Sequence, residues 1–217
     1  MASKAQGSQS SVTGRGFSKD LGSRLRQARE RKHFTVRGLA RFVGVSPSLV
    51  SQIERGRVTP SVGTLYAIAN QLELVVDDLF RDAAPNREVA SHVDAVNPLQ
   101  RPRDRKAIRL AGGVRWERLT PRPDAEIEFL YVVYEPGAES CDKDSLIRHG
   151  GKEYAYMISG RLGIKIGFEE FELGPGDSIA FDAQMPHRLW TIGKEPAEAI
   201  WVVLNRHGDN RVQHANS

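Results

Sequence analysis

The chain has little cysteine and no long hydrophobic run, and both absences narrow its possible functions. Its 217 residues include a single cysteine, Cys141, so neither an internal disulfide nor a cysteine-based zinc cage can form within one chain. No stretch approaches the roughly 18 consecutive apolar residues of a membrane span. The Ser- and Gly-rich residues 1–16 also lack the apolar core of a signal peptide. We therefore expect a cytoplasmic protein with no membrane partner.

Positive charge is concentrated in the first half of the chain. Residues 1–106 hold 18 Lys and Arg against 10 Asp and Glu, a net charge of +8, whereas residues 107–217 carry a net charge of −4. Most of the positive charge lies between Arg15 and Arg57. A polyanion is therefore a plausible partner for the N-terminal half and not for the C-terminal half.

The spacing of apolar residues changes from helical to strand-like along the chain. From Leu21 to Phe80 it predicts four short helices and a final helical turn, with breaks at 34–35, 44–46, 56–60 and 73–74. Beyond residue 106, short runs separated by Gly and Pro predict an antiparallel sandwich or barrel. Its strands are expected at 114–119, 127–134, 153–158, 161–166, 170–173, 178–181 and 199–204.

These patterns predict a multidomain chain. We expect a disordered arm at 1–16, an all-α domain at 17–80, a linker at 81–106 with at most one edge strand, an all-β domain at 107–204 and a flexible tail at 205–217.

Residues 35–56 carry the strongest functional signal in the sequence. Thr35 can cap one helix, and Gly44 can take the positive φ of its C-terminus. Ser46 followed by Pro47 is a capping residue and a first-turn proline, which together start a second helix sharply. This arrangement of two helices around a tight turn predicts a helix-turn-helix.

The second helix of this pair has an outward face suited to the major groove of DNA. Leu49 or Val50, with Ile53, is expected to face the core, while Gln52 can make a bidentate contact to adenine. Flanking arginines suit phosphates, which position the protein without reading sequence. We expect Glu54 to be a structural partner of a basic residue. The expected DNA-binding residues are Arg37, Arg41, Ser46, Pro47, Ser48, Ser51, Gln52, Arg55 and Arg57.

Residues 21–80 resemble the lambda-repressor-like, Cro/repressor-type helix-turn-helix domain of the Xre family. The family's signature around the recognition helix is matched closely by the run from Ser48 to Gly56, and Pro60-Ser61 and residues 65–69 also match. The resemblance implies sequence-specific binding to operator DNA. The alternative is a helical bundle whose arginines only form a solvated face.

Two segments of the second half could supply ligands for a metal ion. His149 and Glu153 lie four residues apart on the approach to one expected strand, and His187 is expected just after another strand. If these three groups converge in the mouth of a barrel, they form a plausible site for a divalent metal.

These segments resemble the two motifs of the cupin family, whose double-stranded β-helix (jelly-roll) barrel often binds metal. The resemblance maps ligands onto His149, Glu153 and His187, but Ile147 stands where the family has a further histidine. Three ligands could still hold zinc, iron or nickel. Alternatively, the site is metal-free and lines an organic-ligand pocket, or the histidines only hydrogen-bond within the barrel. The expected pocket wall comprises Tyr156, Phe181, Trp190 and Trp201.

A helix-turn-helix followed by one cupin resembles a class of bacterial transcription regulators with a small-molecule sensor. The resemblance implies a homodimer on a palindromic operator, an effector in the cupin domain, and repression as the commoner outcome. One alternative is a metal-dependent cupin enzyme, a dioxygenase or isomerase, with an appended DNA-binding domain. Another is a structural DNA binder that lacks sequence preference.

Overall fold

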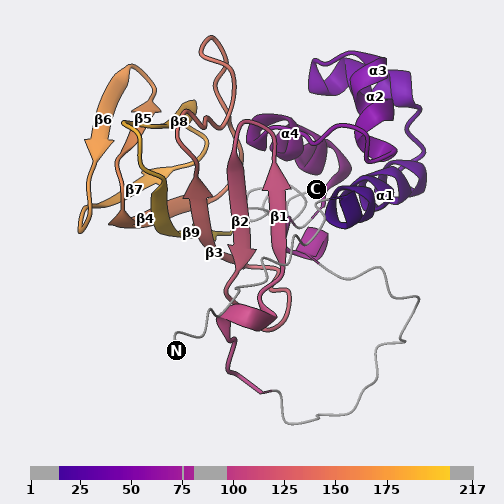
Figure 1. Ribbon diagram of the computed structural model, residues 1–217. Coiled ribbons are helices and arrows are strands. Elements are labelled where there is room, and N and C mark those ends of the chain that lie inside the picture. The colour runs from indigo at the N-terminus through magenta and orange to yellow at the C-terminus, as the bar shows by residue number, and fades with distance from the viewer. Residues whose placement is uncertain (1–14, 75, 81–96, 206–217) are drawn as a thin grey trace, which may run out of the picture.

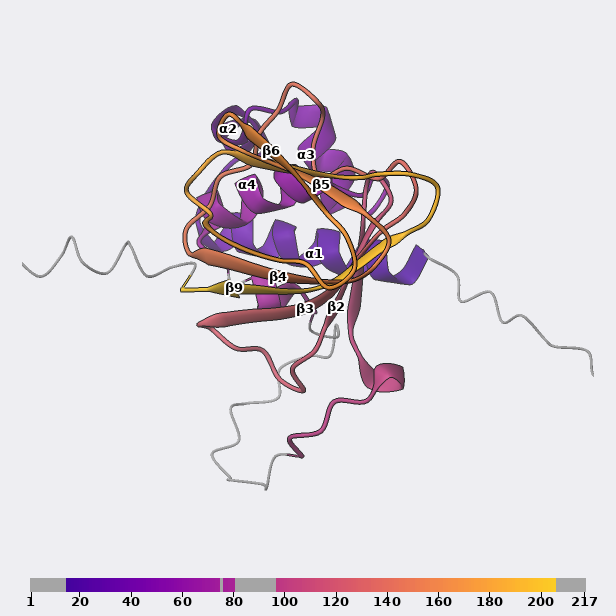
Figure 2. The ribbon, with the colours of Figure 1, turned by 90° about the vertical axis from the view of Figure 1, so that its left-hand side faces the viewer.

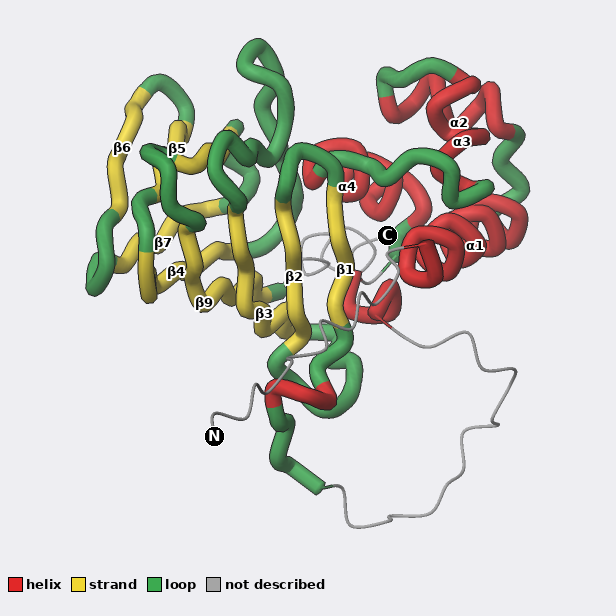
Figure 3. Tube along the Cα trace, viewed as in Figure 1, coloured by secondary structure: helices red, strands yellow, loops and turns green. Residues whose placement is uncertain are grey.

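The computed structural model describes residues 15–74, 76–80 and 97–205, and divides them into a helical part and a β part (Figures 1 and 3). The helical part contains α1 (Arg15–Arg31), α2 (Val36–Val43), α3 (Pro47–Glu54), α4 (Val62–Leu72) and the 3-10 turn η1 (Val76–Phe80). This confirms the four predicted helices and the final turn. None of the helices in the described ranges has the length and apolar character needed to cross a membrane.

Three side-chain caps set where the short helices begin. The hydroxyl of Thr35 accepts a hydrogen bond from the backbone N–H of Gly38, and Ser46 and Ser61 cap α3 and α4 in the same way. Gly44 ends α2 with a φ of 75°, a left-handed conformation that favours glycine. The turn between α2 and α3 is therefore fixed by local chemistry, as the sequence predicts.

The β part contains two antiparallel sheets that face each other (Figure 2). The larger sheet has the strand order β1-β2-β3-β9-β4-β7, and the smaller sheet has the order β6-β5-β8. This arrangement confirms the predicted all-β cupin fold. The strands are β1 (Ala107–Leu110), β2 (Val114–Arg118), β3 (Ile127–Tyr134), β4 (Lys152–Ser159), β5 (Leu162–Ile166), β6 (Glu169–Leu173), β7 (Ser178–Asp182), β8 (His187–Thr191) and β9 (Ala197–Leu204).

Two of these strands, β1 and β8, differ from the sequence prediction. His187 follows β7, as expected, but it also opens β8, a strand that the sequence prediction did not include. The sequence conceals β8 because His187 and Arg188 are buried polar residues, which break the usual apolar alternation. β1 is a short edge strand of four residues that begins one residue after the expected linker.

The segments expected to be disordered or flexible fall mostly outside the described residues. These are residues 1–14 of the arm, 81–96 of the linker and 206–217 of the tail. α1 begins at Arg15, inside the segment expected to be an arm. The described part of the linker, residues 97–106, contains the 3-10 turn η2 (Pro102–Asp104) and no strand.

The helical and β parts share one hydrophobic core instead of standing apart. α4 lies against one end of the barrel, where the N–H of Gly63 donates to the carbonyl of Ser140 over 3.0 Å. Nearby, the N–H of Ala111 donates to the carbonyl of Pro60 over 2.9 Å. Viewed along the barrel, α4 and α1 lie beyond the two sheets (Figure 2). The DNA-binding candidate and the metal-site candidate are therefore in direct contact through α4.

Candidate functional site

The outer face of α3 carries the side chains expected to contact DNA. Val50 and Ile53 are each 1% exposed and anchor the helix, whereas Pro47 and Ser48 are exposed. Gln52 donates from its amide nitrogen to the Ser48 hydroxyl over 3.0 Å. This bond holds the amide at the helix surface, where a base edge could replace the serine as its partner.

The remaining expected DNA-binding residues are also accessible. Ser51 is half-buried, and the others are exposed: Arg37, Arg41, Ser46, Arg55 and Arg57. Their exposure is compatible with phosphate and base contacts, which stay a prediction.

Glu54 is held away from this face by a buried ion pair. Its carboxylate accepts hydrogen bonds from Nε of Arg29 at 2.6 Å and from Nη2 at 3.0 Å. The side chains of Arg29 and Glu54 are only 10% and 7% exposed, and Arg29 also donates to the carbonyl of Phe34. The paired carboxylate raises the pKa of Arg29, chiefly through the hydrogen bond. Glu54 therefore fixes α3 against α1, and its basic partner lies far away in sequence.

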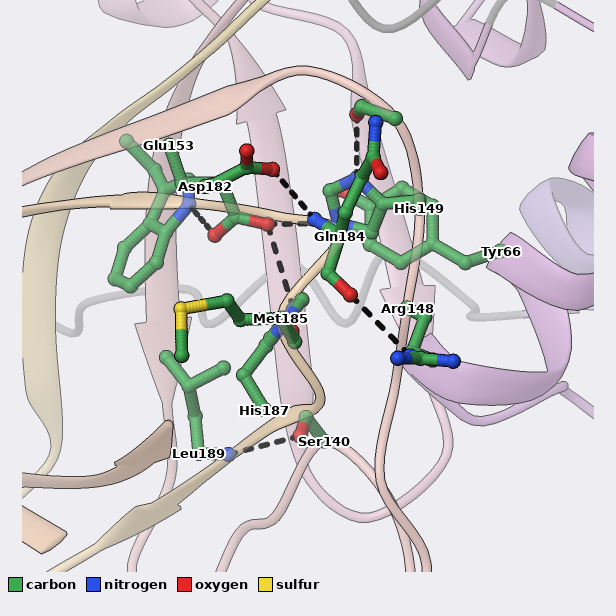
Figure 4. Close-up of polar contacts among 12 residues, drawn as sticks. Tyr66, Ser140, Arg148, His149, Glu153, Asp182, Gln184, Met185, His187 and Leu189 are labelled. Carbon is green, nitrogen blue, oxygen red and sulfur yellow. Dashed lines mark hydrogen bonds and ion pairs between the residues drawn. The ribbon is translucent and has the colours of Figure 1, made fainter. Parts of the chain in front are cut away.

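In the β part, the three predicted ligands converge inside the barrel (Figure 4). His149 precedes β4, Glu153 lies within β4, and His187 begins β8. Nε2 of His149 lies 2.7 Å from Oε1 of Glu153, and Nε2 of His187 lies 3.4 Å from the same oxygen. All three residues are buried, with ligand atoms within 4.8 Å of one another.

Hydrogen bonds at the far side of each ring determine which nitrogen faces this cluster. Nδ1 of His149 lies 3.0 Å from the carbonyl of Gly150, and Nδ1 of His187 lies 2.9 Å from the carbonyl of Met185. Because a carbonyl only accepts, Nδ1 carries the proton in each ring. Nε2 of each ring therefore faces Glu153: it can donate to the carboxylate when the ring is protonated, and it offers a lone pair when the ring is neutral. Metal-binding histidines have this arrangement, with the second nitrogen donating to a backbone carbonyl.

The charges in the cluster also suit a cation. Nε2 of His149 is buried and makes no well-formed hydrogen bond with any residue that the structure describes, although it lies close to the carboxylate. Burial opposes ionisation of Glu153, but the facing imidazoles of His149 and His187, together with the indole N–H of Trp201, outweigh it and lower the pKa of Glu153. Burial lowers the pKa of His187. Two imidazole lone pairs beside a carboxylate would be stabilised by a proton or a metal ion between them.

Two further residues shape this cluster. The indole N–H of Trp201 donates to Oε2 of Glu153 over 2.7 Å, which leaves Oε1 turned toward the histidines. Ile147 lines the cavity and also packs toward α4: a Cβ placed on Gly63 would lie 3.4 Å from its Cγ1. The position where the cupin family has a histidine is therefore used for contact with the DNA-binding domain.

The expected pocket residues lie in different surroundings. Trp201 lines the cavity beside the cluster, and the ring of Phe181 lies 5.1 Å from that of His187. The expectation that Tyr156 lines a pocket is wrong: it is 53% exposed, because successive side chains on β4 alternate between faces. Trp190 is also misplaced, since it lies outside the cavity against Gly163.

The sequence did not identify Tyr66 of α4 as part of this site. Its ring lies 4.3 Å from the His149 ring with an interplanar angle of 34°, and Figure 4 shows it reaching from α4 to His149. Tyr66 and Val62 line the cavity beside Glu153 and His187. The volume of this cavity is about 20 Å³. The signal that could have found Tyr66 is its place on α4 beside Leu65 and Ile68, where an aromatic hydroxyl requires a polar partner.

Comparisons with known proteins agree with this architecture. Residues 20–81 match the family model described as a helix-turn-helix domain, and residues 130–203 match the cupin domain. Over 58 residues, the chain is 36% identical to the uncharacterized HTH-type transcriptional regulator YazB of Bacillus subtilis, covering 27% of this chain and 84% of YazB. It is 21% identical to the HTH-type transcriptional regulator PuuR of Escherichia coli over 76% of this chain and 84% of PuuR.

A solved structure supports the fold over most of the chain. The crystal structure of an HTH_3 family transcriptional regulator from Vibrio cholerae superposes with a TM-score of 0.60 at 22% identity, covering 87% of this chain and 96% of that one. With the helix-turn-helix match and the YazB relative, the chain therefore belongs to the HTH-type transcriptional regulators, and it joins a DNA-binding helix-turn-helix domain to a cupin domain.

Proposed function

We propose that this regulator binds a palindromic operator as a homodimer, with α3 in the major groove, and that a ligand in its cupin domain changes the binding. The observation that supports the proposal is the direct contact between α4 and the buried His149, Glu153 and His187 cluster. A ligand at that cluster touches a wall built by the DNA-binding domain. Operator binding would place the working protein in the cytoplasm, and repression stays the expected outcome.

For the ligand, we propose a divalent metal ion: zinc, iron or nickel. His149, Glu153 and His187 would hold it through two imidazole nitrogens and one carboxylate oxygen, a donor set that suits each of these metals. Trp201 and the backbone carbonyls would orient the ligands. A bound ion would supply a fixed positive charge among otherwise repelling lone pairs.

The volume of the cavity favours an ion over a metabolite while α4 is docked. A space of about 20 Å³ is close to the roughly 10–15 Å³ that one water needs. An organic effector inside this cavity would need α4 to move. The same volume also favours sensing over the alternative of a metal-dependent enzyme, because a substrate would need to reach the cluster.

Binding-site selection with the purified chain tests the DNA-binding half of the proposal. A short palindromic site should be enriched by the wild type, while Gln52→Ala and Ser48→Ala should lose preference at particular positions of that site. Equal affinity for the selected site and random DNA at fixed salt, with mutants like wild type, would instead favour structural DNA binding. Sedimentation of the protein–operator complex tests the dimer.

Cobalt, a coloured substitute for zinc, tests the metal half. Stoichiometric binding with a visible spectrum is expected for the wild type, and loss of the spectrum for His149→Ala and His187→Ala. If the metal-loaded protein also consumed oxygen or turned over a screened substrate, the enzyme alternative would replace the sensor.

A further inference from the structure

Tyr66 belongs to the DNA-binding domain by sequence and to the cupin site by position. Its ring lies 4.3 Å from the His149 ring and 5.4 Å from that of Trp116 on β2. Its hydroxyl is 3.4 Å from a carboxylate oxygen of Glu128 on β3. Tyr66 is only 5% exposed, so α4 cannot leave the barrel without uncovering it.

We infer that Tyr66 is a positioning residue for the metal site, and that cation binding and the docking of α4 stabilise each other. This inference rests on the proposed metal site. The Tyr66 ring covers the His149 ring, whose side chain is fully buried. With α4 docked, His149 cannot swing its Nε2 away from Glu153 without displacing Tyr66.

The chemistry of the stacked pair supports coupling in the reverse direction. A cation on Nε2 draws electron density from the His149 ring, and the face of an aromatic ring attracts positive charge. The Tyr66 face should therefore hold the ligated His149 ring more tightly than the neutral one. By thermodynamic linkage, the factor by which docking tightens cation binding equals the factor by which the cation favours docking.

The remaining contacts of α4 make docking a definable state. Gly63 is the close-approach point: a Cβ built on it would lie 3.2 Å from the Cβ of Cys141. Cys141 is 8% exposed, and burial raises the pKa of its thiol. Undocking of α4 should expose this thiol, so the rate of its alkylation reports the undocked fraction.

The first arm of the test compares cobalt binding by the wild type, Tyr66→Phe and Tyr66→Leu, each as the full chain. Phenylalanine keeps the ring and should keep both the affinity and the visible spectrum. Leucine removes the stacking ring and should weaken cobalt binding by roughly 10- to 100-fold, as loss of an outer-shell partner does, with an altered spectrum. Equal affinity and an unchanged spectrum for Tyr66→Leu would overturn the inference.

The second arm measures the wild-type protein, with one variant as its control. Saturating cobalt should slow alkylation of Cys141 by iodoacetamide, by a factor on the order of 10 for a typical coupling. His149→Ala should show no such protection. If cobalt binds but leaves the alkylation rate unchanged, the coupling is refuted and the metal site survives. If the wild type binds no cobalt, the proposed metal site and this inference both fail.

Discussion

The ion pair between Arg29 and Glu54 makes a quantitative prediction about how the recognition helix is held. Glu54→Gln keeps the shape of the side chain but leaves the Arg29 guanidinium, which is 10% exposed, facing a neutral amide. Removing one partner of a buried pair typically costs about 3–5 kcal/mol. Arg29 keeps its hydrogen bond to the carbonyl of Phe34 and its ion pair with the more exposed Glu30, whose Oε1 lies 3.5 Å from Nη2, so we expect a loss of about 1–3 kcal/mol in the free energy of unfolding.

Urea unfolding followed by far-UV circular dichroism measures this loss, and an exposed pair provides a matched control. Lys32 and Glu73 lie 2.6 Å apart, but their side chains are 41% and 67% exposed. Lys32→Gln should therefore cost less than about 1 kcal/mol. If Glu54→Gln were as mild as the control, Glu54 would not anchor α3, and its carboxylate would have to be reconsidered as a DNA contact.

Three further predictions concern the helices and the metal site. Gly22→Ala should lower the free energy of unfolding in urea by about 1–3 kcal/mol despite the better helix propensity of alanine, because its Cβ would overlap the carbonyl oxygen of Ile53; a neutral result would contradict this contact. Trp201→Phe removes the donor to Glu153 and should weaken cobalt binding roughly 10-fold or more, whereas unchanged affinity would exclude Trp201 from ligand orientation. Arg37→Ala should weaken binding to all DNA sequences alike and reduce the salt slope by about 1; a change at one base position would indicate base reading instead.

Local chemistry explains why the helical part could be predicted well. Thr35, Gly44 and Ser46 act within a few residues of their own positions, so caps and turns can be inferred without the tertiary structure. The partner of Glu54 could not, because Arg29 lies 25 residues away on another helix. Several other basic residues of the domain would have satisfied the same sequence argument.

The parity of strand positions explains the errors in the pocket. Tyr156 lies three residues after Glu153 on β4, and Trp190 lies three residues after His187 on β8. Residues an odd number apart along one strand point to opposite faces of the sheet. Tyr156 therefore cannot share a cavity with Glu153, and Trp190 cannot share one with His187. This reasoning requires His187 to be within a strand, and the buried polar start of β8 concealed that from the sequence.

The docking of α4 could not be predicted from sequence at all. Val62 lies on the apolar face of α4, and it lines the barrel cavity together with Tyr66. An apolar helix face fits either surroundings equally well, and which partner it contacts depends on how the two domains meet. For the same reason, the sequence shows that Ile147 replaces a metal-ligating histidine, but it does not predict that Ile147 contacts α4.

The most direct test introduces a cysteine on α4 with Gly63→Cys and measures how tightly this variant binds the selected operator. The affinity is compared with a disulfide between residue 63 and Cys141 formed (oxidised) and with the same disulfide broken (reduced). A Cβ built on residue 63 lies 3.2 Å from the Cβ of Cys141. If these two atoms move apart by a few tenths of an ångström, they reach the spacing of a disulfide, which would lock α4 on the barrel. Gly63→Ser provides the control that cannot be locked.

If occupancy of the cupin site controls DNA binding through α4, cobalt should change the operator affinity of the reduced protein. The oxidised protein should have the affinity of the cobalt-loaded state whether or not cobalt is present. The account would be contradicted if the oxidised protein matched the cobalt-free state and still responded to cobalt, or if cobalt changed operator affinity in neither form.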